Sequence, residues 1–260
     1  MSNIQKVGII GAGAMGQGIA QIAAQAGLEV YLFDVSAEAI SKAQKQLQAI
    51  WERLTERGRM TAEQMQAAQA QVKPCFTLEA LAESDLVVEA IVENLAVKQD
   101  VFKQLEAIVS PTCILASNTS SLSITAIAQV CEYPERVAGF HFFNPVPLMK
   151  VVEVIEGLRT SGATCAALVT IAKRMGHTPV RAKATPGFIV NHAGRPMNIE
   201  GLKIAQEQVT DFATVDVIMR EQAGFRMGPF ELLDLTALDV SHLVMESIYN
   251  QFYHEPRFRP

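Results

Sequence analysis

The sequence has few of the residues that mark several protein classes. Only four of its 260 residues are cysteine, at Cys75, Cys113, Cys131 and Cys165, and no C-x-x-C pair occurs. Such wide spacing argues against a disulfide framework or a zinc knuckle and favours free thiols in a reducing compartment. The histidines form no H-E-x-x-H motif. The sequence therefore predicts no metal site.

Charge is also scarce, since charged residues make up 19% of the chain and the net charge is −5. This balance argues against binding of nucleic acid or an anionic membrane surface. No basic segment precedes a signal-type apolar stretch at the N-terminus. The apolar residues 7–30 include six glycines and three glutamines, which is typical of strand, turn and helix rather than a membrane span. We expect a cytoplasmic protein.

A G-x-G-x-x-G motif follows the first apolar run, at Gly11, Gly13 and Gly16. The first glycine allows a tight turn, the second lets a pyrophosphate approach the backbone, and the third lets the next helix pack on the strand. The N-terminus of that helix offers free N–H groups to phosphates. A second apolar run, residues 29–33, ends in Asp34, and an acid at this distance suits the ribose 2′-hydroxyl of NAD. An ordinary glycine-rich turn is the alternative.

Strand and helix patterns alternate through the first half of the chain. Strands are expected at residues 6–10, 29–33, 86–90, 113–116, 137–140 and 151–155, and helices at 15–26, 37–57, 61–71 and 95–108. This alternation predicts an α/β fold with a Rossmann-like, doubly wound, mostly parallel sheet. The two successive helices at about 37–71 form a helical-hairpin insertion, which serves either ligand binding or only stability.

The pattern changes after Val180, where Pro186 and Gly187 interrupt the chain. Helices are expected at 188–208, 214–221 and 229–248. We therefore predict a dinucleotide-binding domain at residues 1–184 and a smaller all-α domain at 185–260. The last residues, 249–260, resemble an unfinished connection, so the helical domain is expected to be incomplete.

A histidine and a glutamate in neighbouring apolar segments are the strongest candidates for catalysis. His141 lies at the end of one expected strand and Glu153 in the middle of the next. A buried carboxylate needs a partner, and the Asn-Pro-Val-Pro turn between the two residues can bring them together. Such a pair removes a proton from a hydroxyl group, with the carboxylate orienting the imidazole. A structural core histidine and a glutamate facing water are the alternatives.

Polar residues Ser117 to Ser121 follow an expected strand, at the carboxyl edge where doubly wound sheets bind ligands. They suit the nicotinamide amide or a substrate oxygen, although Ser121 or Ser123 also suits the cap of the next helix. Asn191 lies near the start of the long helix of the second domain. Its position is compatible with a ligand site but does not by itself indicate one.

Several motifs together make the sequence similar to the 3-hydroxyacyl-CoA dehydrogenases, including the 3-hydroxybutyryl-CoA type. The resemblance covers the whole chain. It rests on the sequences GAGAMG at 11–16, LVVEA at 86–90, SNTSSL at 117–122, HFFNPVP at 141–147, PGFIVN at 186–191 and MGPFELLD at 227–234.

The resemblance implies a role for each site residue. His141 corresponds to the catalytic base and Glu153 to its orienting partner, whereas Ser120 and Asn191 correspond to groups that hold the substrate. The positions that line the NAD site are Gly11, Gly13, Met15, Gly16, Asp34, Glu93, Lys98, Ser120 and Asn144. The helical hairpin corresponds to the part that contacts coenzyme A, with Lys42 or Lys45 near a phosphate.

The implied function is reversible, NAD-dependent oxidation of (3S)-3-hydroxyacyl-CoA to 3-ketoacyl-CoA. The implied partners are an acyl-CoA thioester and a second copy of the chain, bound through the helical domain. Three alternatives stay open: a dehydrogenase of a non-CoA hydroxy acid, a non-catalytic NAD-binding protein, and a module of a larger fatty-acid-oxidation protein. The sequence departs from the family at His192, where arginine is usual, and at its C-terminal end.

Overall fold

The computed structural model describes residues 4–260. The chain divides into two compact units, the first ending at Ala184 and the second comprising Thr185–Pro260. Within the described residues, every helix is too short or too polar to traverse a lipid bilayer.

The first unit is built on one sheet, to which eight strands of the described residues contribute in the order β3-β2-β1-β4-β5-β6-β7-β8. Strands β1 to β6 are mutually parallel, whereas β7 runs antiparallel to β6 and parallel to β8. The order 3-2-1-4-5-6 is that of a doubly wound dinucleotide-binding sheet, so the predicted fold class is confirmed. The strands are β1 (Lys6–Ile10), β2 (Glu29–Phe33), β3 (Val72–Cys75), β4 (Leu86–Glu89), β5 (Ile114–Ser117), β6 (Val137–Phe142), β7 (Val151–Glu156) and β8 (Thr178–Lys183).

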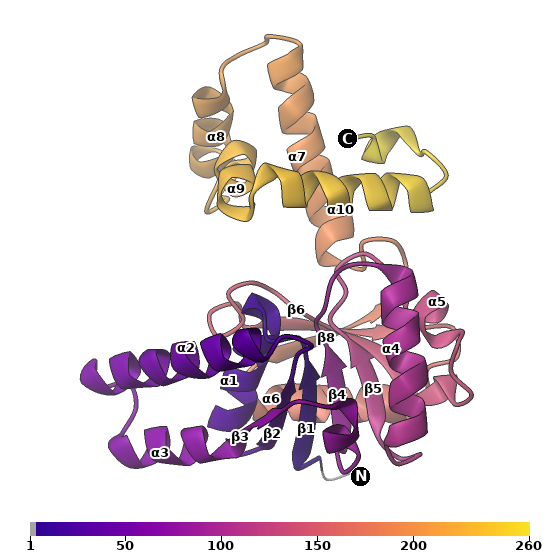
Figure 1. Ribbon diagram of the computed structural model, residues 1–260. Helices are drawn as coiled ribbons and strands as arrows, with labels where there is room; N and C mark the ends of the chain where they lie inside the picture. Colours follow the sequence, from indigo (N-terminus) through magenta and orange to yellow (C-terminus); the bar gives the residue numbers. More distant parts are fainter. Residues whose placement is uncertain (1–3) are drawn as a thin grey trace. The chain divides into compact units, whose positions relative to one another are not determined.

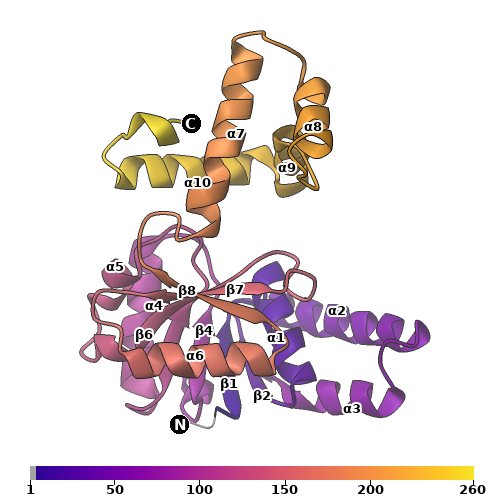
Figure 2. The same cartoon turned by 180° about the vertical axis from the view of Figure 1, so that it is seen from behind.

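Helices cover both faces of this sheet, as Figures 1 and 2 show from opposite sides. Helix α4 lies over one face and α6 over the other. The helices of this unit are α1 (Ala14–Gln25), α2 (Ala37–Glu56), α3 (Ala62–Gln71), α4 (Leu95–Ile108), α5 (Ile124–Ala128) and α6 (Gly162–Arg174).

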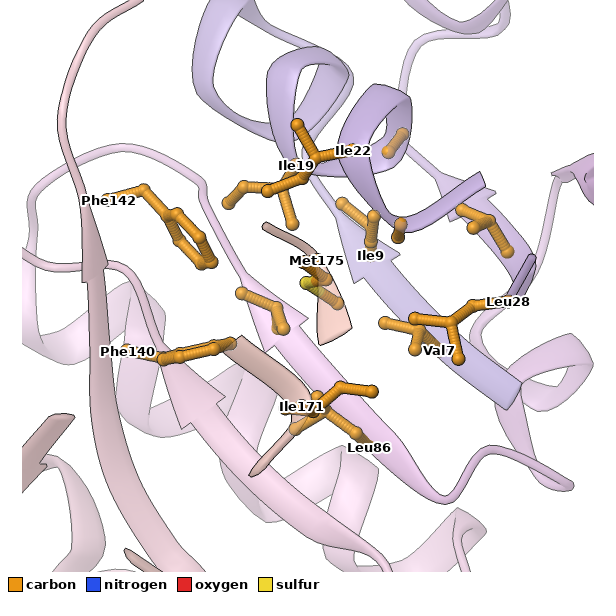
Figure 3. Packing of buried hydrophobic residues seen from close by; sticks show 14 of the residues in the cluster. Val7, Ile9, Ile19, Ile22, Leu28, Leu86, Phe140, Phe142, Ile171 and Met175 are labelled. Carbon is orange, nitrogen blue, oxygen red and sulfur yellow. The ribbon is translucent and has the colours of Figure 1, made fainter. Parts of the chain in front are cut away.

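The main core lies between the sheet and the layer that contains α1 and α6. Figure 3 shows Ile19 and Ile22 from α1 packed over Val7 and Ile9 from β1. Phe140 and Phe142 alternate with His141 along β6 and point into this core. Because successive strand residues point to opposite faces, His141 is directed to the other side of the sheet.

The predicted helical hairpin is present as α2 and α3, which lie side by side in both views (Figures 1 and 2). Ser36 caps α2 by accepting a hydrogen bond from the Ala39 N–H, and Thr61 caps α3 in the same way with Gln64. The buried residues of α2 repeat at helical spacing and are Ile40, Ala43, Leu47 and Trp51. This apolar stripe attaches the hairpin to the core.

Two strands and one α-helix of the first unit have no counterpart among the predicted elements. Strands β3 and β8 lie at the two edges of the sheet, and both are rich in polar residues or proline. Edge strands tolerate such residues because one side of the backbone is unpaired, and the apolar alternation that reveals a strand is then lost. Helix α6 is buried through Leu168 and Ile171, and it connects the last two strands.

The second unit consists of helices α7 (Val190–Gln206), α8 (Phe212–Glu221), α9 (Pro229–Thr236) and α10 (Leu238–Gln251) with their connections. The prediction of one helix at 229–248 is wrong, since the chain breaks at Ala237, whose φ is +65°. The residues around this position include neither glycine nor proline, so the sequence gives no signal of the break. The carboxylate of Asp216 accepts hydrogen bonds from the Phe230 and Glu231 N–H groups at the start of α9.

Candidate functional site

The glycine turn between β1 and α1 has the geometry of a phosphate-binding turn. Gly11 has a φ of +103°, and a Cβ there would lie 2.5 Å from the Ala90 carbonyl oxygen. A Cβ on Gly16 would lie 1.8 Å from the Gly11 carbonyl oxygen, whereas one on Gly13 would meet nothing within 4 Å. Two glycines therefore allow close packing, and the third leaves open space where a pyrophosphate would approach the N-terminus of α1.

Asp34 follows β2 and is held beside this turn. Its Oδ2 accepts a hydrogen bond from the Ala12 N–H at 2.8 Å and its Oδ1 one from the Ser36 N–H at 3.0 Å. Met15, in the first turn of α1, is half-buried. The open backbone and the adjacent carboxylate fit a dinucleotide with a free ribose 2′-hydroxyl.

A cavity of about 570 Å³ extends from the glycine turn to helix α2. Its lining includes Gly13, Gln17, Lys42, Gln46 and Arg53. Lys42 also borders a second hollow together with Lys45. Cationic side chains of α2 therefore reach the same cavity as the phosphate-binding turn.

The two side chains expected to meet in the middle of the chain are in direct contact. His141 on β6 lies opposite Glu153 on the antiparallel strand β7, and His141 Nδ1 is 2.7 Å from Glu153 Oε2. His141 is 5% exposed and Glu153 0% exposed, so the alternative of a water-facing glutamate is wrong. An ionised carboxylate only accepts hydrogen bonds, so a contact with ionised Glu153 has Nδ1 as the donor, and Nε2 is the ring nitrogen that does not face Glu153.

The loop after β5 is organised around the carboxylate of Glu93. Its Oε1 accepts hydrogen bonds from the Thr119 hydroxyl at 2.6 Å, the Ser120 N–H at 2.9 Å and the Ser121 N–H at 3.1 Å. Burial opposes the charged form of Glu93, but the Lys98 ammonium and these hydrogen bonds outweigh it and hold its pKa below the ordinary value. Ser123, not Ser121, caps α5 by accepting a bond from the Ala126 N–H.

The remaining predicted residues have different surroundings. Lys98 is 1% exposed, and its Nζ lies 2.5 Å from Glu89 Oε1, so its charge is buried in an ion pair. Asn144 is exposed just after β6. Asn191 belongs to the second unit, where its Oδ1 accepts a hydrogen bond from Arg195 at 3.2 Å. His192 of the same helix packs its ring against Phe252 and Phe258.

Glu89 and Arg53 have no role in the predicted site, and Asn118 is predicted only as part of the polar segment 117–121. Glu89 is a charged residue at the end of an apolar strand, and this is a sequence signal of a buried carboxylate. Asn118 Oδ1 accepts a hydrogen bond from the Phe142 N–H at 2.8 Å, next to His141. Arg53 lines the cavity one turn beyond Ile50. In residues 4–260, no three His, Cys, Asp or Glu side chains gather as a metal site would require.

Comparison with known families accounts for both units. A family model described as "3-hydroxyacyl-CoA dehydrogenase, NAD binding domain" matches residues 6–185, and one described as "3-hydroxyacyl-CoA dehydrogenase, C-terminal domain" matches residues 187–260. The chain belongs to the 3-hydroxyacyl-CoA dehydrogenase family. Its first unit is the NAD-binding domain of that family, in agreement with the predicted cofactor.

Curated relatives within the family include a 3-hydroxyadipyl-CoA dehydrogenase of Escherichia coli, 45% identical over 260 residues, which are 100% of this chain but only 55% of that protein. The chain thus spans about half the length of this relative. A probable 3-hydroxybutyryl-CoA dehydrogenase of Bacillus subtilis is 40% identical over 257 residues, 99% of this chain and 89% of that protein.

Solved structures of family members have the same fold. The 3-hydroxybutyryl-CoA dehydrogenase of Escherichia coli superimposes with a TM-score of 0.97 at 45% identity, over 100% of this chain and 55% of that one. The (S)-3-hydroxybutyryl-CoA dehydrogenase of Ralstonia eutropha gives a TM-score of 0.96 at 39% identity, over 99% of this chain and 91% of that one.

Proposed function

We propose that this protein catalyses the reversible, NAD-dependent oxidation of (3S)-3-hydroxyacyl-CoA thioesters to 3-ketoacyl-CoA. The observation that carries the proposal is the buried contact of 2.7 Å between His141 and Glu153, in a chain whose first unit is an NAD-binding domain. Two alternatives, a dehydrogenase that uses no such pair and an NAD-binding protein without catalysis, do not explain why a carboxylate is buried against this histidine.

His141 acts as the general base in this proposal. Its Nε2 accepts the proton of the substrate's 3-hydroxyl group, while the Nδ1–H bond to Glu153 fixes the ring and stabilises the imidazolium that forms. NAD, when bound, supplies the acceptor for the hydride that leaves C3. Ser120 of the loop after β5 and Asn191 of α7 are proposed to hold the substrate oxygens, and Asn144 and Glu93 to line the cofactor site.

The cationic face of α2 supports the coenzyme A part of the proposal. Lys42 and Arg53 line the cavity of about 570 Å³ beside the glycine turn, and Lys45 borders the neighbouring hollow. Lysine and arginine are the side chains that proteins use to bind phosphate. We propose that they contact phosphate groups of the acyl-CoA substrate.

A homodimer formed through the second unit is part of the proposal. This unit leaves large apolar side chains exposed, namely Phe212, Val217, Ile218, Leu235, Leu238 and Leu243. Exposed apolar side chains in such number favour association with another chain. A cytoplasmic location is also proposed, since all four cysteines are buried free thiols, as expected in a reducing compartment.

The test is an assay of NADH absorbance with a panel of 3-ketoacyl-CoA thioesters that includes acetoacetyl-CoA and 3-ketoadipyl-CoA. NADH should be consumed with at least one thioester, and His141→Gln should lower kcat by roughly 10² to 10⁴ without loss of NADH binding. Absence of turnover with every thioester, or near-normal turnover in His141→Gln, contradicts the proposal.

A further inference from the structure

A second buried carboxylate lies next to the site, at the end of β4. Glu89 is 0% exposed, so its carboxylate has no contact with solvent. Its Oε1 accepts hydrogen bonds from the Ile91 N–H at 2.8 Å and from Lys98 Nζ at 2.5 Å, and its Oε2 one from the Ser117 hydroxyl at 2.6 Å. One carboxylate thereby joins the end of β4, helix α4 and the end of β5.

The ammonium group of Lys98 extends this contact to a second carboxylate. Its side chain is 1% exposed, and Nζ lies 2.5 Å from Glu89 Oε1 and 3.4 Å from Glu93 Oε2. The charge of Glu89 therefore helps to keep Lys98 in place between two acids. If that charge is removed, Lys98 becomes a buried cation with one less partner.

Two routes from Glu89 end on the same short loop. The first passes through the Ser117 hydroxyl, which accepts a hydrogen bond from the Thr119 N–H at 3.3 Å. The second passes through Lys98 to Glu93, whose Oε1 binds Thr119, Ser120 and Ser121. Both routes hold the loop that carries Ser120.

Stability alone does not explain this arrangement. A buried ion pair is often no more stable than well-packed apolar residues of the same volume, because desolvation offsets the attraction. What the pair does supply is a fixed geometry. The buried hydrogen bonds of Glu89 and Lys98 are satisfied only when both side chains keep one arrangement. The four residues of β4 are otherwise apolar, so the acid occurs only at the end next to the site.

We propose that Glu89 is a positioning residue of the site. It acts through Lys98, Glu93 and Ser117 to hold the Thr119–Ser121 loop in the geometry that binds the nicotinamide end of NAD and the substrate. It has no contact with reacting atoms. The kinetic part of this inference rests on the function proposed above, whereas the effect on NADH binding does not.

Helix α4 also carries a matched control, Glu106, which lies near the amino-terminal ends of the strands, away from the site. The Glu106 side chain is 12% exposed, and its Oε1 lies 3.3 Å from Arg136. Its carboxylate accepts hydrogen bonds from the Glu132 and Tyr133 N–H groups. Arg136 in turn binds the Ser110 carbonyl oxygen, before the start of β5. Glu106→Gln therefore disrupts a similar pair on the same helix without disturbing the site.

The experiment compares Glu89→Gln with Glu106→Gln by thermal unfolding, NADH binding and turnover. NADH affinity is measured by energy transfer from Trp51, the only tryptophan in the sequence. Both variants should unfold at lower temperature. Only Glu89→Gln should raise the Kd of NADH and lower kcat, each by about tenfold, the scale expected when a charged hydrogen-bond partner is lost.

Unchanged NADH affinity and kcat in folded Glu89→Gln overturn the inference, and so do equal losses in both variants. If Glu89→Gln does not fold, Ser117→Ala removes a single hydroxyl link and should raise the Kd of NADH in the same direction by a smaller factor. An unchanged Kd in Ser117→Ala then overturns the inference. A wild-type chain inactive on every thioester contradicts the proposed function, while its NADH affinity still decides the role of Glu89.

Discussion

Single residues of this protein serve two purposes at once, and Asp34 is a clear example. Its two carboxylate oxygens accept hydrogen bonds from the Ala12 and Ser36 N–H groups, so it supports the glycine turn. The same carboxylate is the proposed partner of the ribose 2′-hydroxyl. Each oxygen has more than one acceptor position, and the two roles are therefore compatible.

Binding of the ribose by Asp34 predicts a difference between NADH and NADPH, whereas support of the glycine turn predicts none. Asp34→Asn keeps one acceptor oxygen for the Ala12 N–H of the turn, but it removes the charge and the acceptor of the Ser36 N–H. We expect the Kd of NADH to rise about tenfold, whereas the Kd of NADPH stays the same or falls, because the 2′-phosphate is no longer repelled. Energy transfer from Trp51 measures both. Equal weakening of the two dinucleotides contradicts the ribose assignment and leaves only the structural role.

At the scale of elements, the loop after β5 is held by the carboxylate of Glu93, which lies in the segment before α4. The Lys98 ammonium and the hydrogen bonds from the loop keep the pKa of Glu93 below its ordinary value, against the effect of burial. A depressed pKa means that the folded state favours the ionised carboxylate. The resulting stabilisation is present at neutral pH and is lost as the pH falls through the folded-state pKa.

Glu93→Gln should therefore change the pH dependence of stability. Wild type should be more stable than the variant to urea at pH 7, and the difference should shrink as the pH falls below about 4.3, the ordinary glutamate pKa. Urea unfolding followed by Trp51 fluorescence from pH 7 to pH 3 measures it. A difference that is equal at both ends of this range contradicts the assigned interactions.

Local patterns predicted the central elements well, and tertiary context explains the rest. The helix at 95–108 and the strand at 29–33 match α4 and β2 residue for residue, because apolar periodicity and turn residues agree there. The contact between His141 and Glu153 can be predicted from the sequence because a buried carboxylate needs a partner. The sequence does not reveal the edge strand β3, because its lysine and proline break the apolar alternation. It does not reveal the partners of Glu93 either, because Thr119 and Ser121 lie 26 and 28 residues away along the chain.

At the scale of the whole molecule, the two units differ in the reporters that they carry. All four cysteines and the only tryptophan lie in the first unit. Burial raises the pKa of the Cys113 thiol to about 12 and that of Cys131 to about 11. It also raises the pKa of Cys75 and Cys165. Thiolates are the reactive species, so the folded first unit should hide its cysteines.

Thiol labelling should therefore report the opening of the NAD-binding unit alone. At pH 8 the native protein should react with fewer than one equivalent of an aromatic disulfide reagent, and urea-unfolded protein with four, the number of cysteines in the chain. NADH binds the folded state, so saturating NADH should shift the urea midpoint of labelling upward. Circular dichroism in the same titration follows the helices of both units. Rapid labelling of a thiol in the native protein contradicts the burial of that cysteine, and a midpoint that ignores NADH contradicts cofactor binding to this unit.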